Sequence, residues 1–214
     1  MNNVFYHSSE SMNEIKDGSI KLIVTHPPFL NWGLGVYGDM INRVFYECYR
    51  VLEDGGVFVC VNTDVKKLDF FSKHIFLHDL LIKNGFVLRD EKIWVRTENN
   101  RYDRMGFSFV QIFSKGKYKK IEINKEFEAG IWSLPFSMNV GDFRDAFHPD
   151  IPKRCIGVFT KKGDLILDPF LGSGTTYKVA KGEGRVCYGY ELNLGLKPLI
   201  EDTLPQTTLQ WIKK

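Results

Sequence analysis

The stretch Leu167-Asp168-Pro169-Phe170-Leu171-Gly172-Ser173-Gly174-Thr175-Thr176 decides the fold. An aliphatic run precedes it, and a segment with helical spacing from about Thr175 to Lys181 follows, so we expect a strand, a glycine turn and a helix. Gly172 and Gly174 lack side chains that would keep a bulky or charged ligand away from the backbone. The stretch therefore predicts a cofactor site at the carboxyl end of a parallel strand.

The glycine turn differs from the common phosphate-binding loops. No lysine follows the glycines as in a Walker loop, and Tyr177 stands where a dinucleotide fingerprint has its third glycine. Glu191 follows the next expected strand, Val186 to Tyr190, where a carboxylate can accept hydrogen bonds from both hydroxyls of a ribose. The alternative for Glu191 is a solvated acid at a strand end.

A second motif, Thr25-His26-Pro27-Pro28-Phe29, follows the β-branched and aliphatic run Ile20 to Val24. That run is typical of a buried parallel strand, so the motif is expected at a strand tip. Consecutive prolines fix φ and offer no N–H, so the carbonyls beside them serve as acceptors. Phe29 adds an aromatic face on which a base can stack.

The remaining pattern alternates between strands and helices, which favours a doubly wound α/β fold with a mainly parallel sheet. Two strands without an intervening helix predict one antiparallel hairpin at a sheet edge. We expect a single domain over residues 1–214, with a loop-rich segment at 114–146 and a broken helical tail. The expected elements are a helix from an N-cap at Asp39 to Leu52 before Gly55-Gly56, a strand at Val57 to Val61, a helix from about Leu68 to Lys83, the hairpin strands Phe86 to Val95 and Phe107 to Phe113, a helix at Pro152 to Phe159 and a strand at Leu165 to Leu167.

The two motifs, in this order, resemble those of the β class of amino-directed DNA methyltransferases. Softer matches are Val51 to Gly56, the strand around Trp94, Phe113 to Lys117, and His148-Pro149 running to Thr160. The resemblance covers nearly the whole chain. It implies a Rossmann-like methyltransferase fold with permuted motif order, in which the two motif-bearing strands are neighbours at the topological switch point. It also implies S-adenosylmethionine as cofactor and a restriction-modification type of DNA methylation, at cytosine N4 or adenine N6.

The resemblance assigns roles to individual residues. Asp168 contacts the methionine portion of the cofactor with Phe170 close to it, although Phe170 can equally fill the space under the loop. The loop residues Gly172, Ser173, Gly174 and Thr175 and the acid Glu191 complete the cofactor site. The catalytic residues are His26, Pro27, Pro28 and Phe29. The Pro27 carbonyl and the side chain before it hold the two N–H bonds of the target amine, which directs the nitrogen lone pair at the methyl group.

His26 is a departure from the family pattern, which has Asp, Asn or Ser before the prolines. A neutral imidazole has one acceptor nitrogen, whereas a protonated imidazole has two donors and repels the amine. We hypothesise that neutral His26 accepts one amine hydrogen bond. The alternative is that His26 impairs catalysis and leaves a cofactor-binding or nucleic-acid-binding module. A second departure is His7-Ser8-Ser9 in place of Gly-Asp-Ser, where Ser8 retains a hydroxyl for the adenine of the cofactor.

Phe29 and Thr25 resemble the cytosine-N4 branch of the family somewhat more than the adenine-N6 branch, so the resemblance favours cytosine N4 as the target. RNA is a further alternative to double-stranded DNA because an unpaired base presents the same amine. Relatives carry their target-recognition segment where this chain has residues 114–146. Its shortness indicates a short recognition sequence, a homodimer or a partner specificity subunit.

The formal net charge of +3 permits contact with nucleic acid without requiring it. The basic residues are grouped along the chain, which is more informative than their total. The candidates for nucleic-acid binding are Arg101, Arg104, Lys115, Lys117, Lys119 and Lys120.

Other classes of site are disfavoured by the sequence. Cys48, Cys60, Cys155 and Cys187 have neither close pairing nor zinc-knuckle spacing, so we expect reduced core thiols. His74 and His78 are four residues apart but lack an evident third ligand, so no metal is expected. Apolar runs are too short for a membrane span and Met1 to Val4 is no signal peptide, so we expect a cytoplasmic protein.

Overall fold

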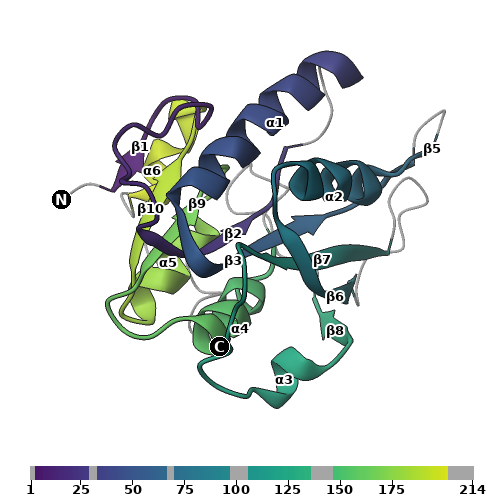
Figure 1. Ribbon diagram of the computed structural model, residues 1–214, viewed down its shortest axis with the longest axis vertical. Helices are drawn as coiled ribbons and strands as arrows, with labels where there is room; N and C mark the ends of the chain where they lie inside the picture. The colour runs from purple at the N-terminus through teal and green to yellow at the C-terminus, as the bar shows by residue number, and fades with distance from the viewer. Residues whose placement is uncertain (1–2, 29–32, 67–69, 97–105, 136–146, 202–214) are drawn as a thin grey trace.

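A computed structural model describes residues 3–28, 33–66, 70–96, 106–135 and 147–201. An eight-stranded sheet with helices on both faces forms its centre (Figure 1). The strand order is β1-β10-β9-β2-β3-β7-β6-β8. The strands are β1 (Val4–Phe5), β2 (Ile20–Thr25), β3 (Leu52–Asn62), β6 (Val87–Arg96), β7 (Phe107–Ser114), β8 (Ile131–Leu134), β9 (Leu165–Asp168) and β10 (Val186–Tyr190); β4 (Val65–Lys66) and β5 (Phe70–Phe71) pair separately.

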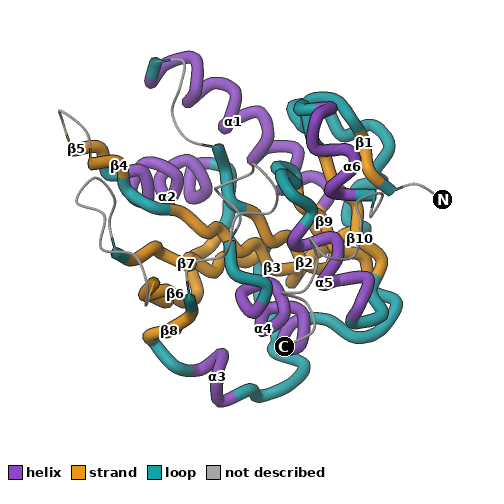
Figure 2. The backbone as a smooth tube through the Cα atoms, turned by 180° about the vertical axis from the view of Figure 1, so that it is seen from behind, coloured by secondary structure: helices purple, strands orange, loops and turns teal. Residues whose placement is uncertain are grey.

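The helices divide between the two faces of the sheet, as the tube in Figure 2 also shows. Helices α1 and α2 cover one face, where Ile20 and Ile23 of β2 belong to their core cluster. Helices α4 and α5 cover the other face, to which Leu22 and Val24 point. This alternation shows that β2 is buried on both sides, and β2 pairs in parallel with both β3 and β9, so the predicted buried parallel strand is confirmed. The helices are α1 (Leu34–Val51), α2 (Lys73–Lys83), α3 (Lys125–Glu128), α4 (Asp150–Phe159), α5 (Thr175–Gly182) and α6 (Lys197–Ile200), with a 3-10 turn at Leu194–Leu196.

The switch point of the sheet lies between β2 and β9, which pair in parallel through Leu22 with Ile166 and Ile23 with Leu167. From β2 the chain passes through α1 to β3 on one side, and from β9 it passes through α5 to β10 on the other. Because the two connections diverge, a crevice opens at the carboxyl ends of these strands. The predicted adjacency of the two motif-bearing strands is confirmed.

The hairpin of β6 and β7 is antiparallel as predicted, and β8 adds one strand beyond it. This strand and helix α3 lie inside the segment 114–146, for which the sequence predicted loops. In β8, Trp132 and Leu134 are buried whereas Ile131 and Ser133 are exposed. Four residues of half-buried alternation give a weak signal, which explains why the sequence did not reveal this strand.

Helix α1 begins at Leu34, with Gly33 as its N-cap, so the predicted N-cap at Asp39 was wrong. The first turn carries Leu34 and Val36, which are 47% and 64% exposed and therefore do not mark a buried face. The chain continues directly from α1 into β3, which includes Gly55 and Gly56. Helix α2 begins at Lys73 rather than near residue 68, after β4 and β5.

Up to residue 201 the predicted broken helical tail is a 3-10 turn followed by the four-residue helix α6, and the rest of the tail lies outside the described residues. None of the helices in the described ranges has the length and apolar character needed to cross a membrane. All four cysteines are free and buried, which confirms them as core thiols. Burial raises the pKa of both Cys60 and Cys155 to about 12.

Gly55 provides a test of the packing at the amino end of β3. Its φ is +79°, and a Cβ there would lie 2.7 Å from the Lys117 carbonyl oxygen. Gly116 has a φ of +66° with nothing within 4 Å of an added Cβ. We expect Gly116→Ala to lower the free energy of unfolding by about 1 kcal/mol, because alanine is strained in the left-handed region. Gly55→Ala should lower it by about 2–3 kcal/mol, because the backbone at Lys117 must also shift. Urea denaturation measures both losses, and equal losses would contradict this packing.

Candidate functional site

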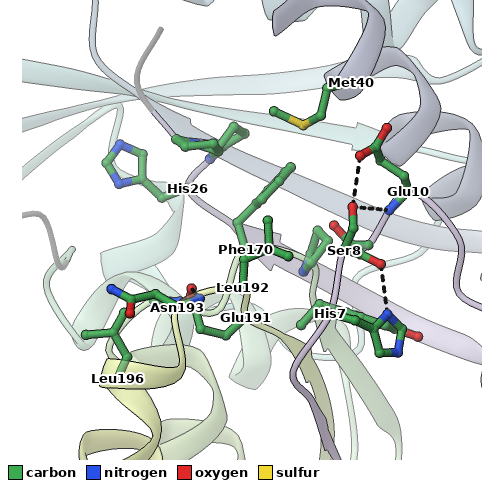
Figure 3. Close-up of a pocket in the computed structure, with 16 residues that line it drawn as sticks. His7, Ser8, Glu10, His26, Met40, Phe170, Glu191, Leu192, Asn193 and Leu196 are labelled. Atoms are coloured by element: carbon green, nitrogen blue, oxygen red, sulfur yellow. Dashed lines mark hydrogen bonds between the residues drawn. The ribbon is translucent and has the colours of Figure 1, made fainter. Parts of the chain in front are cut away.

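The carboxyl ends of β2 and β9 open onto one cavity of about 690 Å³ (Figure 3). Small-molecule sites typically enclose about 300–1,000 Å³, so the cavity suits a ligand of nucleoside size or larger. It brings together residues from both sequence motifs, from the amino-terminal segment and from the chain after β10. The lining residues are His7, Ser8, Ser9, Glu10, His26, Pro27, Pro28, Met40, Pro169, Phe170, Gly172, Tyr190, Glu191, Leu192, Asn193 and Leu196.

A hydrogen bond between side chains joins the two strand ends beneath the cavity. The Thr25 hydroxyl donates to Asp168 Oδ1 at 2.8 Å, and the Thr176 hydroxyl donates to Asp168 Oδ2 at 2.7 Å. The Phe170 amide also donates to Oδ1, at 3.1 Å. Burial raises the pKa of the Asp168 carboxyl to about 6, although these three donors oppose the shift. Asp168 is 1% exposed and faces the strand joint, so its contact with a cofactor stays a prediction.

The glycine turn has the backbone that its sequence predicted. Gly172 and Gly174 have φ values of 54° and 80°, which L side chains disfavour, and Gly174 is the N-cap of α5. Ser173 and Thr175 are buried, and their hydroxyls lie 3.2 Å apart. Of these four residues, Gly172 lines the cavity, whereas Ser173, Gly174 and Thr175 shape the turn behind it.

Glu191 closes the turn from the tip of β10. Its Oε2 accepts a hydrogen bond from the Gly172 amide at 2.8 Å, and its Oε1 accepts one from the Asn193 amide at 2.7 Å. A carboxylate has about four acceptor positions, so both oxygens can still accept bonds from a ligand that carries vicinal hydroxyls. Phe170 is half-buried and is drawn between His26 and Ser8 in Figure 3, so it projects into the cavity from the turn.

Sequence reasoning missed an acid in the opposite wall. The Ser8 hydroxyl donates to Glu10 Oε1 at 3.0 Å, and Arg43 pairs with Glu10 Oε2 at 2.6 Å. Both Ser8 and Glu10 line the cavity (Figure 3). The segment that lacks the family's Asp therefore carries an anionic acceptor two residues after Ser8. The signal that the sequence offered was an acid, Glu10, two residues after Ser8.

The proline pair lies across the cavity from Glu10. His26, Pro27 and Pro28 all line the cavity, and the His26 ring meets Phe147 edge-on at a centroid distance of 6.3 Å. Phe29 lies outside the described residues, so its predicted stacking role stays a prediction. The structure thus brings three of the four predicted catalytic residues to the same cavity as Gly172 and Glu191.

Both carbonyls of the proline pair accept hydrogen bonds from buried side chains. The Lys73 ammonium, at the start of α2, donates to the Pro27 oxygen at 2.7 Å. The Tyr37 hydroxyl, on α1, donates to the Pro28 oxygen at 3.0 Å. Sequence reasoning did not anticipate these donors, because nothing local connects either residue to the prolines.

The four lysines after β7 lie at the other edge of the sheet from the cavity. Lys115 donates at 2.9 Å to the carbonyl of Tyr49, in the last turn of α1, and at 2.8 Å to that of Leu52, at the amino end of β3. Lys120 pairs with Glu128 at 2.7 Å. The structure does not bring Lys115, Lys117, Lys119 or Lys120 to the cavity, and Arg101 and Arg104 lie outside the described residues. Contact of these six residues with nucleic acid stays a prediction.

No group of three or more His, Cys, Asp and Glu side chains that could hold a metal ion occurs among the described residues. The two histidines considered as ligands have other neighbours. His74 bonds to Asp64 at 2.7 Å, and His78 lies 3.1 Å from Asp79.

Comparisons with known proteins place this geometry in context. The family model for N6/N4 methylases, described as DNA methylase, matches residues 20–202. The Type II methyltransferase M.MjaI of Methanocaldococcus jannaschii is 28% identical, over 94% of this chain and 90% of its own length.

Two solved proteins have a similar fold. A candidate DNA modification methylase from Thermus thermophilus is 25% identical, with a TM-score of 0.79, over 95% of this chain and 94% of its own. It has also been solved with S-adenosylmethionine, where it superposes with a TM-score of 0.75 at 22% identity, over 98% of this chain and 95% of its own. The cytosine-N4-specific PvuII DNA methyltransferase is 19% identical, with a TM-score of 0.80 over 97% of this chain and 90% of its own, and shows the same fold.

The raised pKa of Asp168 predicts a pH-dependent stability. Its proton is held more tightly in the folded protein, so the contribution of Asp168 to stability is fully present below pH 4 and is lost as pH rises through about 6. Asp168→Asn cannot titrate, yet its amide can still bond to Thr25 and Thr176. Between pH 4 and 7 the free energy of unfolding of the wild type should therefore fall by on the order of 3 kcal/mol relative to that of this variant.

Urea denaturation of the ligand-free protein at several pH values measures this difference. Asp79→Asn, at a side chain that is 72% exposed, controls for the change in net charge. A difference between wild type and Asp168→Asn that stays constant from pH 4 to 7 would contradict a raised pKa.

Proposed function

Because the chain belongs to the N6/N4 family of DNA methylases, which transfer methyl groups to base amines, we propose that it methylates the exocyclic N4 amine of cytosine in DNA. One observation carries the proposal. The proline pair and the Glu191-closed glycine turn, which are far apart in the chain, line one cavity. Such a cavity can hold a methyl donor and an extruded base side by side.

S-adenosylmethionine is the cofactor, and it supplies an electrophilic methyl group on a sulfonium. The residues present fit this molecule. Glu191 keeps acceptor positions for the ribose hydroxyls, and Ser8 with Glu10 offers a hydroxyl and a carboxylate for the adenine amine. Phe170, which is drawn between His26 and Ser8 in Figure 3, and Gly172, whose amide bonds to Glu191, line the same cavity and would border the methionine portion.

The target amine is a poor nucleophile because its lone pair is delocalised into the ring. His26 and the Pro27 carbonyl supply the two acceptors that can hold its N–H bonds. Held in this way, the nitrogen is biased toward a form whose lone pair points at the methyl group. After transfer the amine must lose a proton, and neutral His26 is a group in this wall that can accept it.

Cytosine is favoured over adenine because the first and last residues of the motif, Thr25 and Phe29, resemble the cytosine-N4 branch of the family. The segment 114–146 includes α3 and β8, so part of it belongs to the folded core rather than to a surface that reads DNA. The surface left for target recognition is therefore small. It suits a short recognition sequence, or it is extended by a second copy in a homodimer or by a partner subunit. A cytoplasmic location, where the DNA is accessible, accords with this function.

His26 also supports a second candidate, a module that binds the cofactor or nucleic acid without transfer. A protonated imidazole at this position would repel the amine. RNA is the alternative polymer, because a flipped cytosine presents the same amine in both.

Transfer from labelled S-adenosylmethionine distinguishes these functions. The protein is incubated with duplex DNA, single-stranded DNA and RNA of mixed sequence, and the labelled base is identified after digestion. We expect N4-methylcytosine from duplex DNA. Label in N6-methyladenine would show that the target is adenine, and label in RNA would show that the substrate is RNA. Saturable cofactor binding without any labelled base would support the binding module.

His26 predicts a pH dependence of turnover. As pH falls through the titration range of an imidazole, His26 gains a proton and loses its acceptor, so kcat should fall. His26→Asn keeps an acceptor oxygen that does not titrate, so its profile should be flatter. His26→Ala should lower kcat by about 10²-fold, the typical loss for one positioned acceptor.

The control is His78→Ala, on α2 beside Asp79, which should leave kcat and its profile unchanged. A flat wild-type profile from mildly acid to neutral pH, or full activity of His26→Ala, would rule out this role.

A further inference from the structure

We propose that Lys73 is a positioning residue for methyl transfer, whose ammonium fixes the Pro27 carbonyl in the direction of the target amine. This inference rests on the proposed function and adds a residue to its machinery. The Lys73 side chain is fully buried, and its Nζ lies 2.7 Å from the Pro27 oxygen. The hydrogen bond spans 46 positions of the chain and joins α2 to the tip of β2.

The proline pair needs such donors because it lies beyond the sheet. Strand β2 ends at Thr25, so backbone pairing does not hold the peptide groups that follow. Prolines have no N–H with which to bond to a neighbouring segment. The Tyr37 hydroxyl holds the Pro28 carbonyl, and Lys73 holds the Pro27 carbonyl, which is the one that faces the amine in the proposed reaction.

The burial of a lysine at this position indicates a specific role for its ammonium. Burial of an ammonium is costly unless it is well hydrogen-bonded, and a neutral hydroxyl suffices for Pro28. A carbonyl oxygen has two lone pairs, so an ammonium on one lone pair fixes its orientation and leaves the other for the amine. Misplacement of a reacting group by about 1 Å can reduce the rate by about 10²-fold.

The first turn of α2 is itself held in place, which fixes the origin of the Lys73 side chain. Asp64, just beyond β3, accepts a hydrogen bond from the His74 amide at 2.9 Å and bonds to His74 Nδ1 at 2.7 Å. The His74 ring stacks on Phe109 of β7 with centroids 3.7 Å apart. Because β3 and β7 belong to the central sheet, Lys73 connects that rigid frame to the proline pair.

The decisive variant is Lys73→Met, which keeps an apolar stem of similar length and removes the donor. Lys83→Met is the matched control, because Lys83 is exposed in the last turn of the same helix. We expect Lys73→Met to lower kcat by about 10²-fold with the Kd for S-adenosylmethionine within about twofold of wild type, since the cofactor contacts are unchanged. Lys83→Met should match wild type in both. Thermal unfolding of all three proteins reports the folded fraction.

Rescue separates positioning from structural support. In Lys73→Ala, added propylamine should restore kcat in a saturable way, whereas propanol and sodium chloride at equal concentration should not. The proposal is overturned by normal kcat in Lys73→Met, by a loss of kcat that only follows the folded fraction or the Kd for the cofactor, or by equal rescue with propanol. A wild type that binds cofactor but transfers no methyl group overturns the proposed function and this role together. An active wild type with an equally active Lys73→Met overturns the Lys73 role alone.

Discussion

The hydrogen bond from the Thr25 hydroxyl to the Asp168 carboxylate is the interaction on which the site depends. It joins two strand ends that are 143 positions apart in the chain. The proline pair begins two residues after Thr25, and the glycine turn begins four residues after Asp168. This bond therefore extends the backbone pairing of β2 and β9 to the point where the two motifs begin. The carboxyl is costly to bury, as its raised pKa indicates, and the Thr176 hydroxyl and Phe170 amide offset part of that cost.

The remainder of the site follows from how the flanking elements hold these two strand ends. Glu191 accepts bonds from the amides of Gly172 and Asn193, so the glycine turn is closed from the tip of β10. Helices α1 and α2 hold the proline carbonyls through Tyr37 and Lys73, so the proline pair is held from the face of the sheet that these two helices cover. Residues from both sides of the switch point therefore meet in one cavity, as the proposed function requires.

The sequence predicted the parts of the site that depend on local backbone chemistry. The glycines of the turn permit positive φ and the consecutive prolines restrict φ, so both features can be recognised residue by residue. The aliphatic runs before them indicate buried strands. Neighbouring placement of β2 and β9 followed from the family order of the motifs and from the rule that ligands bind at a switch point.

The parts that the sequence did not predict depend on tertiary contacts. In the sequence, nothing distinguishes Lys73 from other lysines of amphipathic helices. Only the structure shows that its ammonium bonds to the Pro27 carbonyl. The lysines after β7 formed a basic cluster in the sequence, but charge spacing does not reveal to which edge of a sheet a cluster belongs. Leu34 and Val36 are exposed apolar residues, so the first turn of α1 does not follow the helical pattern of buried residues from which the start was predicted. Strand β8 has only four residues, which is too few for its alternation to be recognised.

The most direct test of the account is a crystal structure with S-adenosylhomocysteine, the product of methyl transfer. The account predicts that its ribose hydroxyls bond to Glu191, that its sulfur faces Pro27 past Phe170, and that the bond between Thr25 and Asp168 remains intact. A ligand that binds outside this cavity, or whose sulfur points away from the proline pair, would contradict the claim that donor and base share one site.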